Sequence, residues 1–278
     1  KRLRFVLGDV RDKERLSRAV DGIDYVVHAA AMKIVPKAEY DPFECIKTNI
    51  LGAMNLIDVC IDRKVKKIVA LSTDKACSPS NLYGGTKLIS DKLFISGNTY
   101  SASPKTIFSV VRYGNVMGSR GSVIPLFLKH INNKALPITD IRMTRFMITL
   151  EQGVNLVWEA FFDMQGGETY VKKIKSMKVT DIALAVNPNA EFEIIGVRPG
   201  EKLHEQMISV EDSPFTYEYD NYFKILPTLN NWNKDLKRIK NGKLVEEDFV
   251  YSSNLNKEWM SKNELREWIK TQREIFYK

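Results

Sequence analysis

The chain has few cysteines and no apolar run of membrane-spanning length. Of its 278 residues three are cysteines, and Cys45, Cys60 and Cys77 lack the paired spacing of a metal site. We therefore expect no metal centre. An odd number of cysteines fits a reducing compartment, so we expect a cytoplasmic protein. With no spanning run and no signal peptide at its start, the chain is not expected to have a membrane partner.

The formal net charge is +8 at pH 7, which raises the question of nucleic-acid binding. The densest basic clusters, residues 172–178 and 234–243, have no interleaved aromatic side chains on which bases could stack. We therefore expect no nucleic-acid partner. A basic surface suits an enzyme that attracts phosphorylated ligands.

Apolar runs typical of strands alternate with stretches typical of helices. A long helix is predicted from Asp41, which would cap Pro42 in the first turn, to Arg63. A second helix is predicted from Asn81 to about Ser96. This alternation indicates an α/β fold with a doubly wound parallel sheet. The predicted strands are residues 5–7, 24–27, 68–71, 108–111 and 168–171.

A polar tetrad, Ser72-Thr73-Asp74-Lys75, follows the apolar run 68–71. Its side chains should emerge at the carboxyl end of a buried strand, where open α/β sheets bind their ligands. Tyr83 and Lys87 are four residues apart in a helical stretch and therefore share one face. Because a neighbouring ammonium favours the phenolate, we expect a lowered pKa for Tyr83, making it an acid or base near neutrality.

The Tyr-x-x-x-Lys spacing also arises by chance, and a solvated helix face would carry it equally well. The preceding strand and its tetrad distinguish the two interpretations. Thr73, Asp74, Lys75 and Tyr83 converging on one pocket would suit redox chemistry and proton transfer at a hydroxylated carbon.

Ordered motifs extend along almost the whole chain. They are Gly8–Asp12, His28–Ala31, Glu44–Asn49, Leu71–Ala76, Asn81–Lys87, Arg112–Val116, Gly118–Val123, Met143–Phe146, Arg198–Glu205 and Tyr251–Asn254. Together they resemble the extended short-chain dehydrogenase/reductases, in particular the 4,6-dehydratases of UDP-N-acetylglucosamine. Lys75 stands where related hexose dehydratases have Glu, and Tyr83 where retaining relatives tend to have Met. The chain is therefore similar to the inverting type, which opens pseudaminic acid synthesis.

The resemblance implies a Rossmann-like sheet that begins with a strand, a glycine-rich turn and a helix around the pyrophosphate of a dinucleotide. No G-x-x-G-x-x-G occurs in this chain, and its first predicted strand, residues 5–7, corresponds to the family's third. We therefore expect a fragment without the first βαβ unit. The resemblance implies NADP, with NAD left open because the discriminating residues belong to that unit.

The implied reaction divides the catalytic work among the converging residues. Tyr83, with Lys87 and Thr73, would take the proton of the sugar's 4-hydroxyl while hydride leaves C4 for the nicotinamide. Lys75 would remove the C5 proton, which requires that desolvation or nearby cations lower its pKa. Asp74, held protonated, would protonate the leaving 6-hydroxyl, and the hydride would return to C6.

The resemblance also implies the binding residues. A homo-oligomer with a UDP-sugar substrate is expected. Residues 1–121 and 140–178 would form the dinucleotide-binding domain, and residues 122–139 and 179–278 a smaller α/β substrate region. The implied cofactor-binding residues are Asp9, Val10, Ala29, Ala30, Ala31, Tyr83, Lys87, Val116, Met117, Gly118, Ser119 and Arg120. The implied substrate-binding residues are Lys33, Thr48, Asn49, Asn115, Val123, Thr139, Arg198, Glu201, Tyr251, Ser252, Ser253 and Asn254, with Arg198 and Glu201 as a clamp on the uridine diphosphate.

Other interpretations stay open. A strand-end turn would also explain Asp9, and a surface cation would explain Lys33. A 4-epimerase would need Tyr83 and Lys87 but no acid and base at C5. A retaining dehydratase and a non-catalytic dinucleotide sensor are further alternatives. Ile34, where the family usually has His, leaves the sugar specificity in question.

Overall fold

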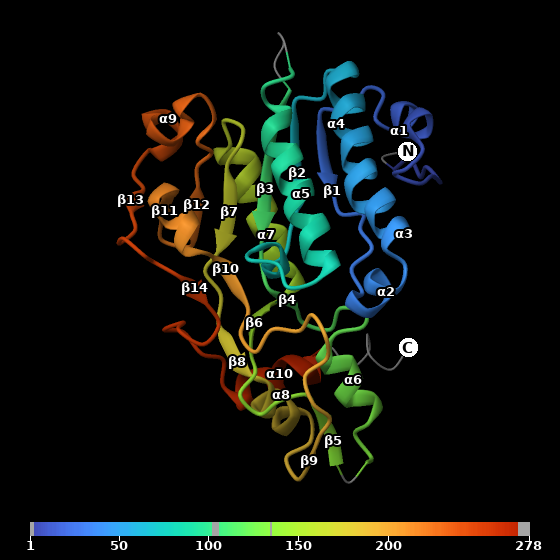
Figure 1. Cartoon of the computed structure of the whole chain (residues 1–278), viewed down its shortest axis with the longest axis vertical. Helices are drawn as coiled ribbons and strands as arrows, with labels where there is room; N and C mark the ends of the chain where they lie inside the picture. Colours follow the sequence, from blue (N-terminus) through green and yellow to red (C-terminus); the bar gives the residue numbers. More distant parts are fainter. Residues whose placement is uncertain (1–2, 102–105, 134, 272–278) are drawn as a thin grey trace.

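The computed structural model describes residues 3–101, 106–133 and 135–271. Figure 1 shows two parts along the long axis, a sheet flanked by helices above and a smaller lobe of helices and short strands below. The chain alternates between strands and helices up to β3, as its apolar pattern predicts. The elements of the amino-terminal half are α1 (Lys13–Ala19), β1 (Tyr25–His28), α2 (Val35–Tyr40), α3 (Pro42–Ile46), the π-helical turn η1 (Lys47–Leu51), α4 (Gly52–Asp62), β2 (Lys67–Leu71), the 3₁₀ turn η2 (Asp74–Ala76), α5 (Leu82–Gly97) and β3 (Ile107–Arg112).

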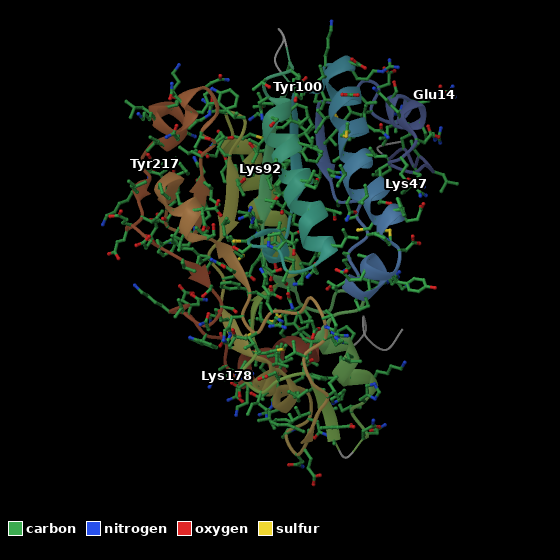
Figure 2. The ribbon with its side chains drawn as sticks, in the orientation of Figure 1. Glu14, Lys47, Lys92, Tyr100, Lys178 and Tyr217 are labelled. Atoms are coloured by element: carbon green, nitrogen blue, oxygen red, sulfur yellow. The ribbon has the colours of Figure 1, made fainter. Side chains whose placement is uncertain are left out.

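The carboxy-terminal half contains more short elements. Lys178 is the last residue of the strand 176–178, and the helix 179–186 of the lower lobe follows it directly (Figure 2). The strands are β4 (Asn115–Val116), β5 (Ala135–Ile138), β6 (Thr144–Ile148), β7 (Thr169–Lys172), β8 (Ser176–Lys178), β9 (Glu191–Ile194), β10 (Gln206–Ile208), β11 (Thr216–Glu218), β12 (Tyr222–Ile225), β13 (Lys243–Leu244) and β14 (Tyr251–Ser252). The helices are α6 (Val123–Lys129), α7 (Leu150–Asp163), α8 (Val179–Val186), α9 (Leu236–Ile239) and α10 (Lys262–Thr271), with 3₁₀ turns η3 (Val210–Phe215) and η4 (Leu229–Lys234).

The central sheet has seven strands in the order β1-β2-β3-β7-β12-β11-β13. The first four are parallel to one another, and the last three join antiparallel. The predicted doubly wound α/β fold is confirmed. The antiparallel extension, residues 216–244, comes from within the range assigned to the substrate region, and the division into two domains stays a prediction.

Helices cover both faces of the parallel strands. Figure 1 shows α4 and α5 in front of β1–β3 and α7 behind them. Ile68 and Ala70 of β2 pack with α4 and α5, whereas Val69 packs with α7. Because successive strand residues point to opposite faces, this two-sided burial explains why β2 is apolar along its length.

The first predicted strand does not form. Residues 5–7 have no regular structure, and Phe5 and Leu7 are about nine-tenths exposed. A strand needs a neighbour for its backbone hydrogen bonds, and none of the described strands lies beside this segment. The prediction of a strand at residues 5–7 is therefore wrong for this structure.

The helical stretch from Pro42 to Asp62 is present but interrupted by the π turn η1. Asp41 occupies the N-cap position, yet its side chain accepts no hydrogen bond there, so the predicted cap is wrong. Asn81 does cap α5, since its side chain accepts a hydrogen bond from the Gly84 N–H. Asn49 is the buried residue of η1. π turns of this kind often occur at functional sites.

Candidate active site

The polar tetrad and α5 meet at the carboxyl end of β2, as predicted. The backbone of Ser72 continues the sheet by donating to Val111 O at 2.7 Å, after which the chain turns into η2. The first turn of α5 packs directly on η2, because a Cβ on Gly84 would lie 2.2 Å from Lys75 O. The missing side chain at Gly84 therefore allows Tyr83 to reach the tetrad.

Tyr83 and Lys87 are both buried on the same face of α5. Burial raises the pKa of the Tyr83 phenol to about 12, although the ammonium of Lys75 and a hydrogen bond with Thr73 act in the opposite direction. The predicted lowering of the Tyr83 pKa is therefore wrong for this structure, because desolvation outweighs the cations. Burial lowers the pKa of Lys87, against the attraction of Asp91.

Lys75 lies between two buried carboxylates. Its Nζ is 3.0 Å from Asp74 Oδ1 and 3.1 Å from Glu205 Oε1. Thr73 also donates to Asp74 Oδ1, at 2.9 Å. Burial alone would lower the pKa of Lys75, but the charges of Asp74 and Glu205 prevail and raise it. The lowered pKa that a lysine base requires is thus not found here, and that prediction is wrong for this structure.

Asp74 has the protonation tendency predicted for it. Its side chain is completely buried, and burial, aided by the charge of Glu205, raises the pKa of Asp74 despite the neighbouring Lys75. Its Oδ2 has no hydrogen-bond partner among the described residues. A carboxyl group in this environment accepts a proton more readily than an exposed one and can then pass it on.

The side chain of Asn49 is hydrogen-bonded to other parts of the protein and does not face solvent. Its amide accepts from Met32 N at 2.8 Å and donates to Met32 O at 3.0 Å and Thr86 Oγ1 at 2.9 Å. These bonds join the loop after β1 to η1 and α5. The Asn49 side chain is almost completely buried, and its amide group is engaged by these protein atoms.

A second buried layer lies beneath the tetrad. Ser72 donates to Asp91 Oδ2 at 2.6 Å, and the same oxygen is 3.6 Å from Arg112. Within the described ranges, the Nε2 atom of His28 has no hydrogen-bond partner. Burial, with the charge of Lys87, lowers the pKa of His28 to about 4. The imidazole is therefore neutral at physiological pH.

The segment with Arg198 and Glu201 folds against the tetrad side of α5. Ser80 Oγ and Asn81 Nδ2 donate to Gly200 O at 3.0 and 2.8 Å, so residues about 120 positions apart are in contact. Arg198 Nε donates to Glu201 Oε1 at 2.9 Å. Arg198 is exposed and Glu201 half-buried, which leaves the guanidinium accessible to a phosphate.

The motif at β14 is mostly turned inward. The Tyr251 hydroxyl donates to Ile174 O and accepts from Ile174 N, at 3.0 and 2.9 Å. Ser252 donates to the exposed Asn254, and the buried Ser253 hydroxyl accepts from Glu205 N at 2.9 Å. Tyr251 and Ser253 therefore bond to the backbone of neighbouring segments. Asn254 has the most accessible side chain of the motif.

The remaining substrate candidates are distributed around the junction of the two parts. Lys33 is exposed in the loop after β1, and Thr48 is half-buried on η1. Asn115 is on β4, Val123 begins α6 and Thr139 follows β5, all three half-buried.

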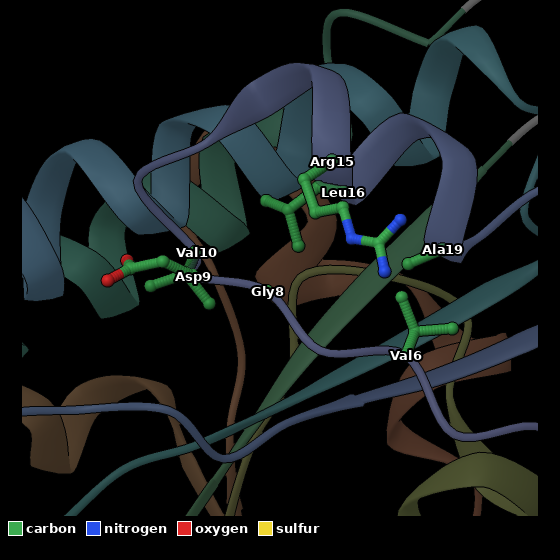
Figure 3. A pocket seen from close by; sticks show the side chains of 7 residues that line it. All are labelled: Val6, Gly8, Asp9, Val10, Arg15, Leu16 and Ala19. Atoms are coloured by element: carbon green, nitrogen blue, oxygen red, sulfur yellow. The ribbon is translucent and has the colours of Figure 1, made fainter.

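Asp9 and Val10 line a small cavity of about 130 Å³ beside α1, together with Gly8, Arg15 and others (Figure 3). The Asp9 carboxylate forms an ion pair with Arg11 at 2.7 Å, and this hydrogen bonding lowers the pKa of Asp9 to about 2. Figure 3 shows that carboxylate pointing away from Arg15 and Ala19. Asp9 is thus a fixed anion at the rim of the cavity.

The other cofactor candidates follow two strand ends. Ala29 and Ala30 are exposed after β1, and Ala31 is half-buried. After β4, Met117 is buried, Gly118 has a positive φ of 75° and Arg120 is exposed; Val116 and Ser119 are half-buried. Val116 also lines an apolar cavity of about 340 Å³ with Tyr25, Leu71, Tyr113 and residues of α7.

These residues fit a dinucleotide. Lys87 is almost completely buried on the same face of α5 as Tyr83, and its ammonium can donate up to three hydrogen bonds. Small exposed alanines and an apolar cavity near Val116 suit flat rings. The described part of the chain contains no group of acidic, cysteine and histidine side chains that could hold a metal ion.

Glu205 and Arg145 are the site residues that sequence reasoning missed. Both are within matching motifs, but neither motif indicates contact with Lys75. Arg145 Nε is 3.8 Å from Glu205 Oε1, which brings β6 to the same cluster. Only the packing of residues 198–205 against η2 reveals that Glu205 is a partner of Lys75.

Comparison with known proteins shows the family to which the chain belongs. A family model described as "Polysaccharide biosynthesis protein" matches residues 1–227. The chain belongs to this family. It is 56% identical over 274 residues to a UDP-N-acetylglucosamine 4,6-dehydratase (inverting) of Campylobacter jejuni subsp. jejuni serotype O:2, covering 96% of this chain and 82% of that protein.

Two further relatives place the chain within the family. It is 42% identical to a UDP-glucose 4-epimerase of Rickettsia canadensis, over 81% of this chain and 67% of that protein. The X-ray structure of Pen from Bacillus thuringiensis superposes with a TM-score of 0.87 at 40% identity, covering 97% of this chain and 82% of that one. No helix among the residues described is long and apolar enough to cross a membrane.

Proposed function

We propose that the protein is a UDP-N-acetylglucosamine 4,6-dehydratase that inverts C5. The observation that carries the proposal is the buried Asp74–Lys75 pair at the end of β2, beside Tyr83 and Thr73. An acid and an amine in contact are the groups that an elimination needs at adjacent carbons. The 56% identity to a dehydratase with this activity supports the same conclusion.

Tyr83 and Thr73 would act at the sugar's 4-hydroxyl. The phenol must lose its proton to accept another, and the charge of Lys75 favours that loss although burial opposes it. Thr73 would hold the same oxygen by a hydrogen bond. A bound nicotinamide would supply the hydride chemistry, as acceptor for C4 and donor for C6.

Asp74 and Lys75 would carry out the elimination. Oxidation at C4 makes the C5 proton acidic, and Lys75 would remove it while Asp74 protonates the leaving 6-hydroxyl. The raised pKa of Asp74 supports its role as the acid. Tyr83 would return a proton to C5 from the opposite face, which gives the inverted product.

The ligand contacts proposed from the sequence complete the assignment. Lys87 would bind the hydroxyls of the dinucleotide's ribose, Asp9 and Val10 its adenine, and residues 116–120 the nicotinamide half. Arg198 would bind the diphosphate of the UDP-sugar with Glu201 orienting it. We propose NADP as the cofactor on the family resemblance. A cytoplasmic location and a homo-oligomer are proposed on the same basis.

A nucleotide-sugar 4-epimerase is the second candidate, because the Rickettsia relative has that activity in its name. An epimerase needs Tyr83 and Lys87 but has no use for an acid and a base at C5 and C6. The contact between Asp74 and Lys75 therefore favours the dehydratase.

The test is to incubate the natural protein with UDP-N-acetylglucosamine in deuterium oxide. We expect a product lighter by one water, with deuterium at C5 and the L-arabino configuration, and no net consumption of cofactor. Mass spectrometry and the NMR couplings across C4, C5 and C6 measure these features. An isomer of unchanged mass with inverted C4 would establish the epimerase, and retained C5 would establish the retaining type.

A further inference from the structure

Glu205 approaches Lys75 from the segment just before β10, whereas Asp74 approaches it from η2 itself. Its carboxylate is almost completely buried, with Oε1 3.1 Å from Lys75 Nζ. Oε2 has no hydrogen-bond partner among the residues that the structure describes. Burying a carboxylate costs folding free energy unless a cation pairs with it. The buried position of the Glu205 carboxylate therefore depends on its contact with the Lys75 ammonium.

We propose that Glu205 is a positioning residue for the elimination: it holds the Lys75 amine between two carboxylates and sets its proton affinity. The inference rests on the proposed dehydratase function. Glu205 is almost completely buried and contacts Lys75, so its proposed effect is exerted through that lysine.

The scaffold around Glu205 is rigid enough for this role. Its N–H donates to Ser253 Oγ at 2.9 Å, and Ser253 also bonds to Thr144 Oγ1 at 2.7 Å. The backbone of Glu205 is thereby joined to the residue that follows β14 and, through it, to β6. The same segment carries Arg198 and Glu201, so the proposed diphosphate clamp and the proposed base are anchored to one stretch of chain.

The charges around Lys75 balance. Asp74 and Glu205 are the carboxylates, Lys75 and Arg145 are the cations, and the Tyr83 phenol lies nearby. Although burial would raise the pKa of Glu205, the charges of Lys75 and Arg145 hold it below its usual range. Glu205 thus stays an anion while a proton moves between Lys75 and Asp74.

Lys75 and Asp74 together can carry out the elimination without a net gain or loss of protons. A proton first passes from Lys75 to Asp74 across their 3.0 Å contact, which leaves a neutral amine and a carboxylic acid. Lys75 takes the C5 proton, the C5–C6 double bond forms, the C6–O bond breaks, and Asp74 protonates the leaving oxygen as water. The resulting Lys75 ammonium and Asp74 carboxylate are the resting pair, and Glu205 has exchanged no proton.

The experiment compares Glu205→Gln, which keeps the size and an acceptor oxygen, with Glu205→Ala, which keeps neither. Competitive acetylation of Lys75, followed by mass spectrometry, reports the fraction of free amine. Loss of an adjacent carboxylate lowers a lysine pKa by about 1–3 units. At a fixed alkaline pH we therefore expect Lys75 in Glu205→Gln to react at least about tenfold faster, because one unit is tenfold in free amine.

Turnover gives the second measurement. Glu205→Gln should shift the acid limb of the kcat profile to lower pH, whereas Glu205→Ala should lower kcat about 100-fold with little change in KM, since misplacing a reacting group costs about that much. Glu218→Gln is the matched control: Glu218 pairs with Lys173 at 2.7 Å on the distant β11, and both Lys75 labelling and turnover should be unchanged.

The outcomes separate the two proposals. Unchanged labelling of Lys75 and an unchanged pH profile in a folded Glu205→Gln variant would overturn the role of Glu205. Faster labelling in that variant, combined with a wild-type protein that eliminates no water, would retain the Glu205–Lys75 coupling and reject the dehydratase function.

Discussion

Lys75 shows how burial and pairing compete at a single residue. Desolvation alone would free its amine, yet two carboxylates within 3.1 Å keep it charged. For Tyr83 the balance is reversed, because desolvation exceeds the effect of the nearby cations. In the resting site Lys75 and Tyr83 are therefore both protonated, although each must lose its proton before it can act as a base. Substrate binding has to favour that loss.

Removing Lys75 should separate the two half-reactions. In Lys75→Ala, Tyr83 and Lys87 remain, so C4 oxidation should still occur, but no base is left for C5. We expect reduced cofactor to accumulate on the protein with turnover reduced at least about 100-fold, as for loss of a general base. Absorbance of the reduced nicotinamide measures it. Equal accumulation in Tyr83→Phe would refute this division of roles.

At the scale of elements, the site depends on the close contact between η2 and α5. The two glycines in the first turn of α5 differ sharply in their surroundings. A Cβ on Gly84 would lie 2.2 Å from Lys75 O, whereas a Cβ on Gly85 would meet no atom within 4 Å. The structure therefore has room for a methyl group at the second position but not at the first.

The two substitutions should therefore have opposite effects. Gly84→Ala must push α5 away from η2, and overpacking of this kind costs about 1–3 kcal/mol of unfolding free energy. Gly85→Ala should stabilise the protein by about 0.5–1 kcal/mol, because alanine is the better helix former. Urea denaturation of both variants measures the difference. A Gly84→Ala protein as stable as Gly85→Ala would show that the contact is not tight.

At the scale of the whole molecule, buried titratable groups link stability to pH. His28 is on β1, packed against Phe94 of α5 and near Lys87. Its pKa falls from 6.5 to about 4 on folding, so the unfolded chain takes up a proton at a higher pH than the folded protein does. Protonation thus favours unfolding, and the effect is absent above the unfolded pKa.

The predicted loss of stability lies between pH 6.5 and about 4. The pKa difference corresponds to about 3 kcal/mol once both values are passed. In His28→Leu this contribution should disappear, so the difference in unfolding free energy between the two proteins should change by about that amount across the window. Denaturant titrations at several pH values test it, and a constant difference would mean that His28 does not titrate on unfolding.

The local pattern of the sequence was sufficient for β2, for α5 and for the shared face of Tyr83 and Lys87, whereas the Asn81 cap of α5 was seen only in the structure. Apolar runs, caps and helical spacing act over a few residues and can be read along the chain. The strand at residues 5–7 was predicted by the same logic and failed, because a strand also needs a neighbour that its own residues do not supply.

Tertiary structure alone decided which groups meet and how they ionise. Glu205 contacts Lys75 although the two are 130 positions apart in the chain, and the Asn49 amide is hydrogen-bonded to Met32 and Thr86. The residues of the tetrad and the raised pKa of Asp74 were evident from the sequence, but the directions of the pKa shifts of Lys75 and Tyr83 were not. Desolvation and charge pairing depend on what packs around a side chain in three dimensions, and that packing joins segments far apart in the chain.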